Sequence, residues 1–186
     1  MNSGGSMEGS PFIIAVSGKS GCGNSTVSSL LAERLGLRLI NFTFRNLAAE
    51  RGITLQQVLE LARDDPSWDR EVDERQVAMA REGDCVIGSR LAIWLLKEAS
   101  LSVYLHASPE TRARRIWNRE GGKYEDVLAF TQSRDAQDTA RYAEIYGIDN
   151  NRYDFADLSI NTERLGPSRI VDIIEAAVRG LRPSRS

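Results

Sequence analysis

The segment from Phe12 to Leu35 constrains the fold most, because a glycine-rich loop joins a β-favouring run to a helical pattern. The run from Phe12 to Val16 is continuously apolar, as in a buried parallel strand. Apolar residues then recur at helical spacing between Val27 and Leu35. The loop between them consists of Gly18, Lys19, Ser20, Gly21, Cys22, Gly23, Asn24, Ser25 and Thr26. This order of elements is typical of phosphate-binding loops, where backbone N–H groups and a helix N-terminus face a phosphate.

The loop departs from the pattern G-x-x-x-x-G-K-[ST] at one residue, because Asn24 stands where the lysine is expected. Its glycines can still bring backbone amides to phosphate oxygens, and the Ser25 hydroxyl can bind Mg²⁺. Two interpretations of the missing lysine remain open. Lys19 can supply the charge, as in deviant P-loops whose lysine acts within one chain or across a dimer. Alternatively, the loop binds nucleotide but transfers phosphoryl poorly, because an amide carries no charge.

Strand and helix patterns alternate along the rest of the chain. They predict strands over 38–42, 85–87, 101–105 and 158–161, and helices over 45–51, 55–63, 68–81, 91–99, from 108 onward and over 168–181. The charge-rich stretch 115–146 is expected to be a solvated helical pair and is the candidate lid. We therefore predict an α/β P-loop NTPase fold with a doubly wound, parallel, five-stranded sheet.

Size and composition limit the remaining possibilities. A chain of 186 residues fits one domain, predicted over 11–186, and the Gly/Ser-rich residues 1–10 read as a loose tail or a cloning remnant. The net charge of −2 argues against a nucleic-acid partner. The apolar runs are far shorter than the roughly 20 residues that cross a bilayer, so a soluble, cytoplasmic protein is expected. Cys22 and Cys85 are expected to be free thiols.

Arginines placed after strands and on one helix face form a second pattern. Arg45 follows the second predicted strand and Arg90 follows the third, where phosphates would lie. In the candidate lid, Arg134, Asp138 and Arg141 have the spacing R-D-x-x-D-x-x-R, which places them on one helix face. This face can be a surface ion-pair stripe, or it can be a set of side chains that converges on two nucleotides during phosphoryl transfer.

Together these residues resemble the cytidylate kinases, especially the short archaeal-type members. The resemblance covers nearly the whole chain after Ser10. It is carried by the glycine loop, the segment 44–48, the acidic residues Asp69 and Asp73, the turn 89–92, and the segment 134–149. It implies a nucleoside monophosphate (NMP) kinase that transfers the γ-phosphoryl group of Mg·ATP to CMP or dCMP. It also implies an NMP-binding region at about 43–82 and a lid at about 116–142.

Carried over position by position, the resemblance implies that the whole loop from Gly18 to Thr26 binds ATP. Arg45 and Arg90 would hold the acceptor phosphate, and Arg134, Asp138 and Arg141 would clamp the acceptor and transferring phosphates. If Lys19 replaces the missing loop lysine, the predicted catalytic set is Lys19, Arg134 and Arg141. Departures from the bacterial members lie at Asn24, before Arg45 and at Leu91. The alternatives are a nucleotide-binding protein with little kinase activity and a kinase for another small acceptor. Either a monomer or a dimer is compatible with the sequence.

Overall fold

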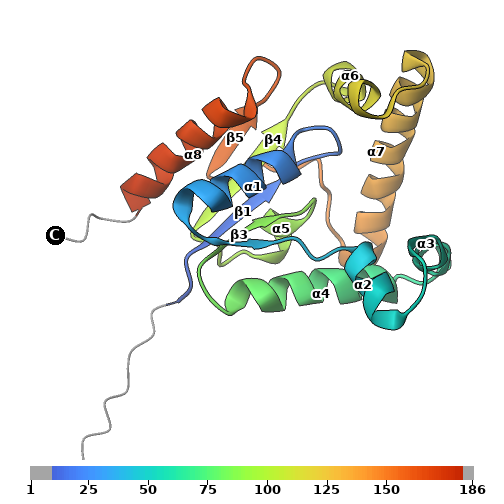
Figure 1. The fold of residues 1–186 in the computed structure, drawn as a ribbon, viewed down its shortest axis with the longest axis horizontal. Coiled ribbons are helices and arrows are strands. Elements are labelled where there is room, and N and C mark those ends of the chain that lie inside the picture. The colour runs from blue at the N-terminus through green and yellow to red at the C-terminus, as the bar shows by residue number, and fades with distance from the viewer. Residues whose placement is uncertain (1–9, 182–186) are drawn as a thin grey trace, which may run out of the picture.

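The strand β1 (Ile13–Ser17) lies at the centre of a five-stranded sheet in the computed structural model, which describes residues 10–181 (Figure 1). The sheet order is β2-β3-β1-β4-β5, and all four pairings are parallel. The other strands are β2 (Arg38–Ile40), β3 (Cys85–Gly88), β4 (Leu101–His106) and β5 (Leu158–Asn161). The predicted doubly wound, parallel, five-stranded sheet is confirmed.

Helices cover both faces of this sheet (Figure 1). They are α1 (Asn24–Leu35), α2 (Phe44–Arg51), α3 (Leu55–Asp64), α4 (Ser67–Arg81), α5 (Ala92–Leu95), α6 (Pro109–Glu120), α7 (Tyr124–Tyr146) and α8 (Pro167–Leu181). Helices α1 and α8 pack on one face, and α4 and α5 pack on the other. The pair α6 and α7 extends to one side, so that α7 runs from α6 toward α2 and α3.

The alternation of side chains along β1 divides the interior into two cores. Ile14 and Val16 face α1 and α8, whereas Ile13 and Ala15 face α4 and α5. All four side chains are at most 1% exposed. The continuous apolar run that predicted this strand is therefore explained by burial on both faces.

Local signals begin the two helices that follow β2. Thr43 and Asn46 form a capping box at α2, and Thr54 and Gln57 form another at α3. In each box the threonine hydroxyl and the side chain three residues later satisfy backbone N–H groups that the helix leaves free. Such a cap contributes about 1 kcal/mol.

One predicted helix is wrong in length. The pattern predicted a helix over 91–99, but α5 spans only Ala92–Leu95. Leu96 leaves the helical region with φ −112° and ψ 67° while its side chain is 1% exposed. The apolar residues after Leu95 therefore fill the core beside a turn that leads into β4, rather than continue a helix.

Several other expectations can be compared with the structure. The two helices expected within 115–146 correspond to α6 and α7, although α6 begins earlier, at its proline. Both Cys22 and Cys85 are buried free thiols, as predicted. Among residues 10–181, no helix is long and apolar enough to cross a bilayer. Most of the predicted tail, residues 1–9, lies outside the described residues.

Candidate nucleotide-binding site

A cavity of about 750 Å³ lies at the carboxyl ends of the central strands. The loop after β1 forms its floor, and Arg90 reaches it from the turn after β3. Arg115 and Arg119 of α6, Arg134 of α7 and the segment 162–167 after β5 complete the wall. Open α/β sheets place their ligands at this edge. Loop residues from Gly18 to Thr26 all line the cavity, so the predicted ATP-binding segment occurs there as one continuous surface.

Two glycines of the loop lie too close to other backbone atoms to be replaced. A Cβ on Gly18 would lie 2.3 Å from the carbonyl oxygen of Leu105, and one on Gly21 would lie 2.9 Å from the carbonyl oxygen of Arg112. Gly21 also has φ +83°, a value that residues with a side chain rarely adopt. The loop is therefore shaped by contact with β4 and α6.

Asn24 does not extend from the loop as the missing lysine would. Its side-chain amide donates a 2.6 Å hydrogen bond to the carbonyl oxygen of Gly18, which joins the two ends of the loop. The other side-chain atom, Oδ1, is buried and has no hydrogen-bond partner among the described residues. Asn24 thus has a structural role in the loop and brings no positive charge to the cavity.

Lys19 lines the same cavity, and its Nζ donates a 2.7 Å hydrogen bond to Oδ1 of Asn151. Asn151 is an exposed residue that follows α7. The acceptor is a neutral amide, and none of the ion pairs among the described residues involves Lys19. Lys19 therefore brings a positive charge to the loop that Asn24 does not.

Arg134 has no ion-pair partner within residues 10–181, although it lines the cavity. Burial, and then the like charge of Arg90, lower the pKa of its guanidinium group. Arg90 itself pairs with Asp138 at 2.6 Å. Burial raises the pKa of Asp138, against the opposing charges of Arg90 and Arg134. Arg90, Arg134 and Asp138 together thus leave a net positive charge beside the cavity, as an anion site requires.

The other two predicted phosphate-binding arginines are not among the residues that line this cavity. Arg141 forms an ion pair with Asp69 of α4 and also donates to the carbonyl oxygen of Ala62 at the end of α3. Arg45 is exposed in the first turn of α2. The sequence pattern placed Arg134, Asp138 and Arg141 on one helix face, but in the structure Arg141 contacts a different part of the molecule from Arg134.

Three arginines of α6 were not predicted to belong to the site. Arg115 donates to the carbonyl oxygen of Gly21 and to Thr162, which joins the loop to the segment after β5. Arg112 donates to the carbonyl oxygen of Ser20, and Arg119 lines the cavity near Arg115. These arginines are spaced three and four residues apart, so they share one helix face, and they directly follow a capped helix start after β4. This pattern could have indicated that they belong to the site.

The residues around the loop are compatible with a metal that arrives with its nucleotide. Ser25 is exposed in the first turn of α1, and no hydrogen bond occupies its hydroxyl among the described residues. The part of the chain that the structure describes has no cluster of three or more His, Cys, Asp or Glu side chains suited to a metal. Mg²⁺ commonly has few protein ligands and binds mainly to substrate phosphates and water. A hydroxyl at this position fits that mode of binding.

Solved structures with the same fold include small-molecule kinases. A shikimate kinase from Bacteroides thetaiotaomicron matches with a TM-score of 0.59 at 16% identity, over 90% of this chain and 98% of that one. A gluconokinase from Sinorhizobium meliloti matches with a TM-score of 0.55 at 20% identity, over 92% and 93%. At these identities the similarity shows the fold alone, which is that of the P-loop kinases.

Sequence relatives identify the family. The model of the cytidylate kinase-like family matches residues 13–164. The chain is 46% identical over 165 residues to cytidylate kinase 2 of Borreliella afzelii, covering 87% of this chain and 93% of the relative. It is also 39% identical over 174 residues to the cytidylate kinase of Pyrococcus horikoshii, covering 92% and 91%. The chain is a kinase-like enzyme that belongs to the cytidylate kinase-like family.

Proposed function

We propose that this protein transfers the γ-phosphoryl group of Mg·ATP to CMP or dCMP, giving ADP and the nucleoside diphosphate. The observation that carries the proposal is the cavity in which the glycine loop faces cationic side chains from three other segments, Arg90, Arg115, Arg119 and Arg134. Phosphoryl transfer needs this combination, because positioning and charge neutralisation supply most of the catalysis. The relatives named cytidylate kinases support the choice of a cytidine monophosphate as acceptor.

The donor phosphates would lie on the loop from Gly18 to Thr26, against the N-terminus of α1. The backbone N–H groups there and the helix dipole favour an anion. The segment 162–167 also lines the cavity and would contact the nucleoside part of ATP. Mg²⁺ would bind the Ser25 hydroxyl and phosphate oxygens, and it would neutralise charge on the transferring group.

Lys19 and Arg134 are the proposed catalytic cations of the donor site. The amide of Asn24 already binds Gly18, so the positive charge of the missing lysine has to come from elsewhere. Lys19 donates to a neutral amide oxygen, and a charged phosphate oxygen is a stronger acceptor. Arg134 has no acidic partner among the described residues, which leaves its guanidinium free for the transferring phosphoryl group.

The acceptor would bind between α7 and an NMP-binding region at about 43–82, with a lid at about 116–142. Arg90 lines the cavity, and with its ion-pair partner Asp138 it would contact the acceptor. Arg45 would approach from α2. Arg141 would have to release Asp69 before it could bind a phosphate, because the ion pair occupies its guanidinium group. Binding of a phosphate by Arg141 therefore requires that its side chain leave Asp69 and the carbonyl oxygen of Ala62.

A coupled assay of ADP release tests the proposal with CMP, dCMP, UMP, AMP and shikimate as acceptors. We expect turnover with CMP and dCMP, and a loss of at least about tenfold in kcat for Lys19→Ala, since one charged contact to the transferring phosphoryl is removed. Lys97→Ala, an exposed lysine outside the cavity, is the matched control.

Two outcomes would contradict parts of this proposal. If only Asn24→Lys is active, the natural protein binds nucleotide without acting as an efficient kinase, and Lys19 does not compensate. If turnover occurs with shikimate or AMP but not with CMP, the proposal of phosphoryl transfer from Mg·ATP holds, and the proposal of CMP or dCMP as the acceptor is wrong.

A further inference from the structure

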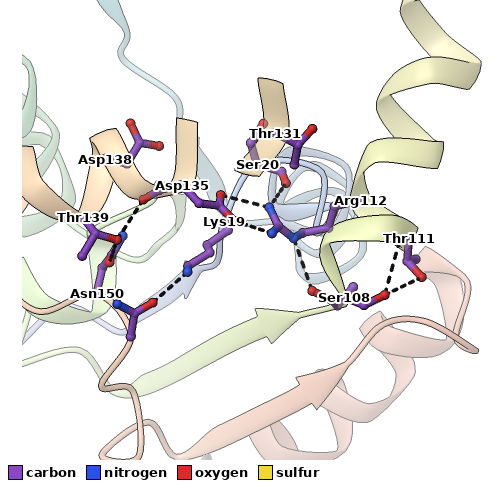
Figure 2. A network of polar contacts seen from close by, with 12 residues as sticks. Lys19, Ser20, Ser108, Thr111, Arg112, Thr131, Asp135, Asp138, Thr139 and Asn150 are labelled. Carbon is purple, nitrogen blue, oxygen red and sulfur yellow. Dashed lines mark hydrogen bonds and ion pairs between the residues drawn. The ribbon is translucent and has the colours of Figure 1, made fainter. Parts of the chain in front are cut away.

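Arg112 is a buried cation directly behind the phosphate loop. Its side chain is only 2% exposed. The guanidinium group donates to the carbonyl oxygen of Ser20 at 3.0 Å and to that of Ala107 at 3.3 Å. It also donates to both carboxylate oxygens of Asp135, at 3.1 and 2.5 Å (Figure 2). One side chain of α6 thus connects the loop, the end of β4 and the helix α7.

The contact with Ser20 fixes the direction of the next backbone amide. The peptide bond between Ser20 and Gly21 is trans and planar, so the N–H of Gly21 points opposite to the carbonyl that Arg112 binds. No described residue accepts a hydrogen bond from that N–H. Gly21 also lines the cavity. The Gly21 amide is therefore already oriented to donate to a phosphate oxygen. Arg112 fixes this orientation through its hydrogen bond to the carbonyl oxygen of Ser20.

Asp135 connects this arrangement to the helix that carries the catalytic arginine. It neighbours Arg134 in α7, and one turn later the hydroxyl of Thr139 donates to Asn150 at 2.8 Å (Figure 2). The next residue, Asn151, accepts the hydrogen bond from Lys19. The loop is therefore connected to α7 through Arg112 and Asp135, and to the segment after α7 through Lys19 and Asn151.

We propose that Arg112 and Asp135 act as a positioning pair for phosphoryl transfer. Arg112 directs the Gly21 amide at the donor phosphates, and Asp135 ties this direction to the placement of α7 and Arg134. The loop amide and Arg134 are then held at a fixed separation across the phosphates. The inference rests on the proposed donor site in the cavity, but not on the identity of the acceptor.

Variants of both partners separate positioning from simple stability. Arg112→Lys keeps the charge, but an ammonium group cannot hold two carbonyls and a bidentate carboxylate together. Asp135→Asn keeps the shape and removes the charge. For each folded variant we expect kcat to fall by about 10- to 100-fold and the KM for Mg·ATP to rise. The reason is that the Gly21 amide and Arg134 would no longer be correctly placed around the phosphates. Asp135→Glu should recover part of the loss. Asp172→Asn, which breaks an Arg–Asp pair between α1 and α8, is the matched control and should change neither constant.

A measurement on the unaltered protein covers the case in which these variants fail to fold. Addition of Mg·ADP to ¹⁵N-labelled protein should shift the Gly21 amide proton downfield, because that amide gains a charged acceptor. Unchanged kcat and KM in folded Arg112→Lys and Asp135→Asn would overturn the proposal, and so would an unmoved Gly21 resonance at saturating Mg·ADP. If Mg·ADP shifts this resonance while CMP is not turned over, the acceptor assignment fails and the positioning pair stands.

Discussion

Asp73 is a carboxyl group of α4 that the fold partly buries against the end of α7. The hydroxyl of Tyr146 donates to it at 2.5 Å, and Asp69 is a second nearby carboxylate. Burial raises the pKa of Asp73 to about 6, the Tyr146 hydrogen bond opposes this shift, and the charge of Asp69 adds to it. At neutral pH the folded protein therefore carries an unfavourable buried charge at this residue.

The pKa of Asp73 predicts how stability depends on pH. The folded state holds this proton up to about pH 6, whereas the unfolded chain releases it near the reference value of 3.8. Asp73 therefore lowers the free energy of unfolding as pH rises from about 4 to 6. Asp73→Asn removes the carboxylate and therefore this loss of stability at higher pH. The asparagine side-chain oxygen can still accept the hydrogen bond from Tyr146. We expect the variant to be more stable than the wild type at pH 7.5 by about 1 to 3 kcal/mol, with roughly a third of that gain at pH 4.5.

Urea unfolding at pH 4.5, 6.0 and 7.5 measures this difference. Asp64→Asn, an exposed carboxylate at the end of α3, is the control and should show no such trend. A gain in stability that is the same at all three pH values would mean that the buried carboxylate is not the cause.

How far single residues could be predicted depends on how local their signals are. The loop from Gly18 to Thr26 was predictable because its glycines, its Ser-Thr pair and its flanking elements are adjacent in sequence. The partner of Arg141 was not, because Asp69 lies 72 positions away on another helix. The role of Asn24 was also hidden, since its hydrogen bond to Gly18 exists only once the loop has closed.

At the scale of elements, α7 contacts two different parts of the molecule. Its first half packs on α6 and carries Asp135, which binds Arg112. Its last turns bind α3 and α4 through Arg141 and Tyr146, and the carbonyl of Ile145 accepts from Arg70. Movement of α4 relative to α7 therefore has to break these contacts.

The ion pair between Arg141 and Asp69 competes with an acceptor phosphate if Arg141 binds that phosphate. We predict that Asp69→Asn lowers the KM for CMP several-fold, because the binding-competent state no longer has to break the pair. Glu71→Gln on the same helix, whose partners are Arg51 and Arg75, is the matched control. Initial rates at saturating Mg·ATP give both KM values. An unchanged or higher KM for Asp69→Asn would exclude Arg141 as a phosphate ligand that Asp69 restrains.

Elements were predicted well where periodicity and caps agree, and less well where tertiary packing decides. Strand β1 and helix α8 follow directly from their apolar patterns. Helix α5 does not, because Leu96 is buried in a turn and a buried turn has the same apolar composition as a helix. The helix predicted from 108 onward is α6, which begins at its proline after the Ser108 cap, because the cap and the first-position proline are local signals.

At the scale of the whole molecule, charge is nearly balanced overall but not at the cavity. The chain has 24 basic and 26 acidic residues, a net charge of −2. Many exposed arginines are paired, as Arg34 is with Asp172 and Arg81 is with Glu98. Arg134 has no such partner among the described residues. The attraction for an anion is therefore local to the cavity, and it does not come from the field of the protein as a whole.

This distribution predicts that nucleotide affinity depends on salt more strongly than folding does. Raising KCl from 0.1 to 1 M shortens the Debye length from about 10 Å to about 3 Å, which screens the solvent-open arginines from a polyphosphate. We expect the Kd for Mg·ADP to rise on the order of tenfold across this range, by titration calorimetry. The melting temperature without nucleotide should change little, because the two apolar cores carry most of the stability. Since chloride binds phosphate sites weakly, competition by the anion itself is small. A Kd that stays constant while the protein remains folded would mean that contacts to the nucleoside, and not the arginines around the phosphates, supply most of the affinity.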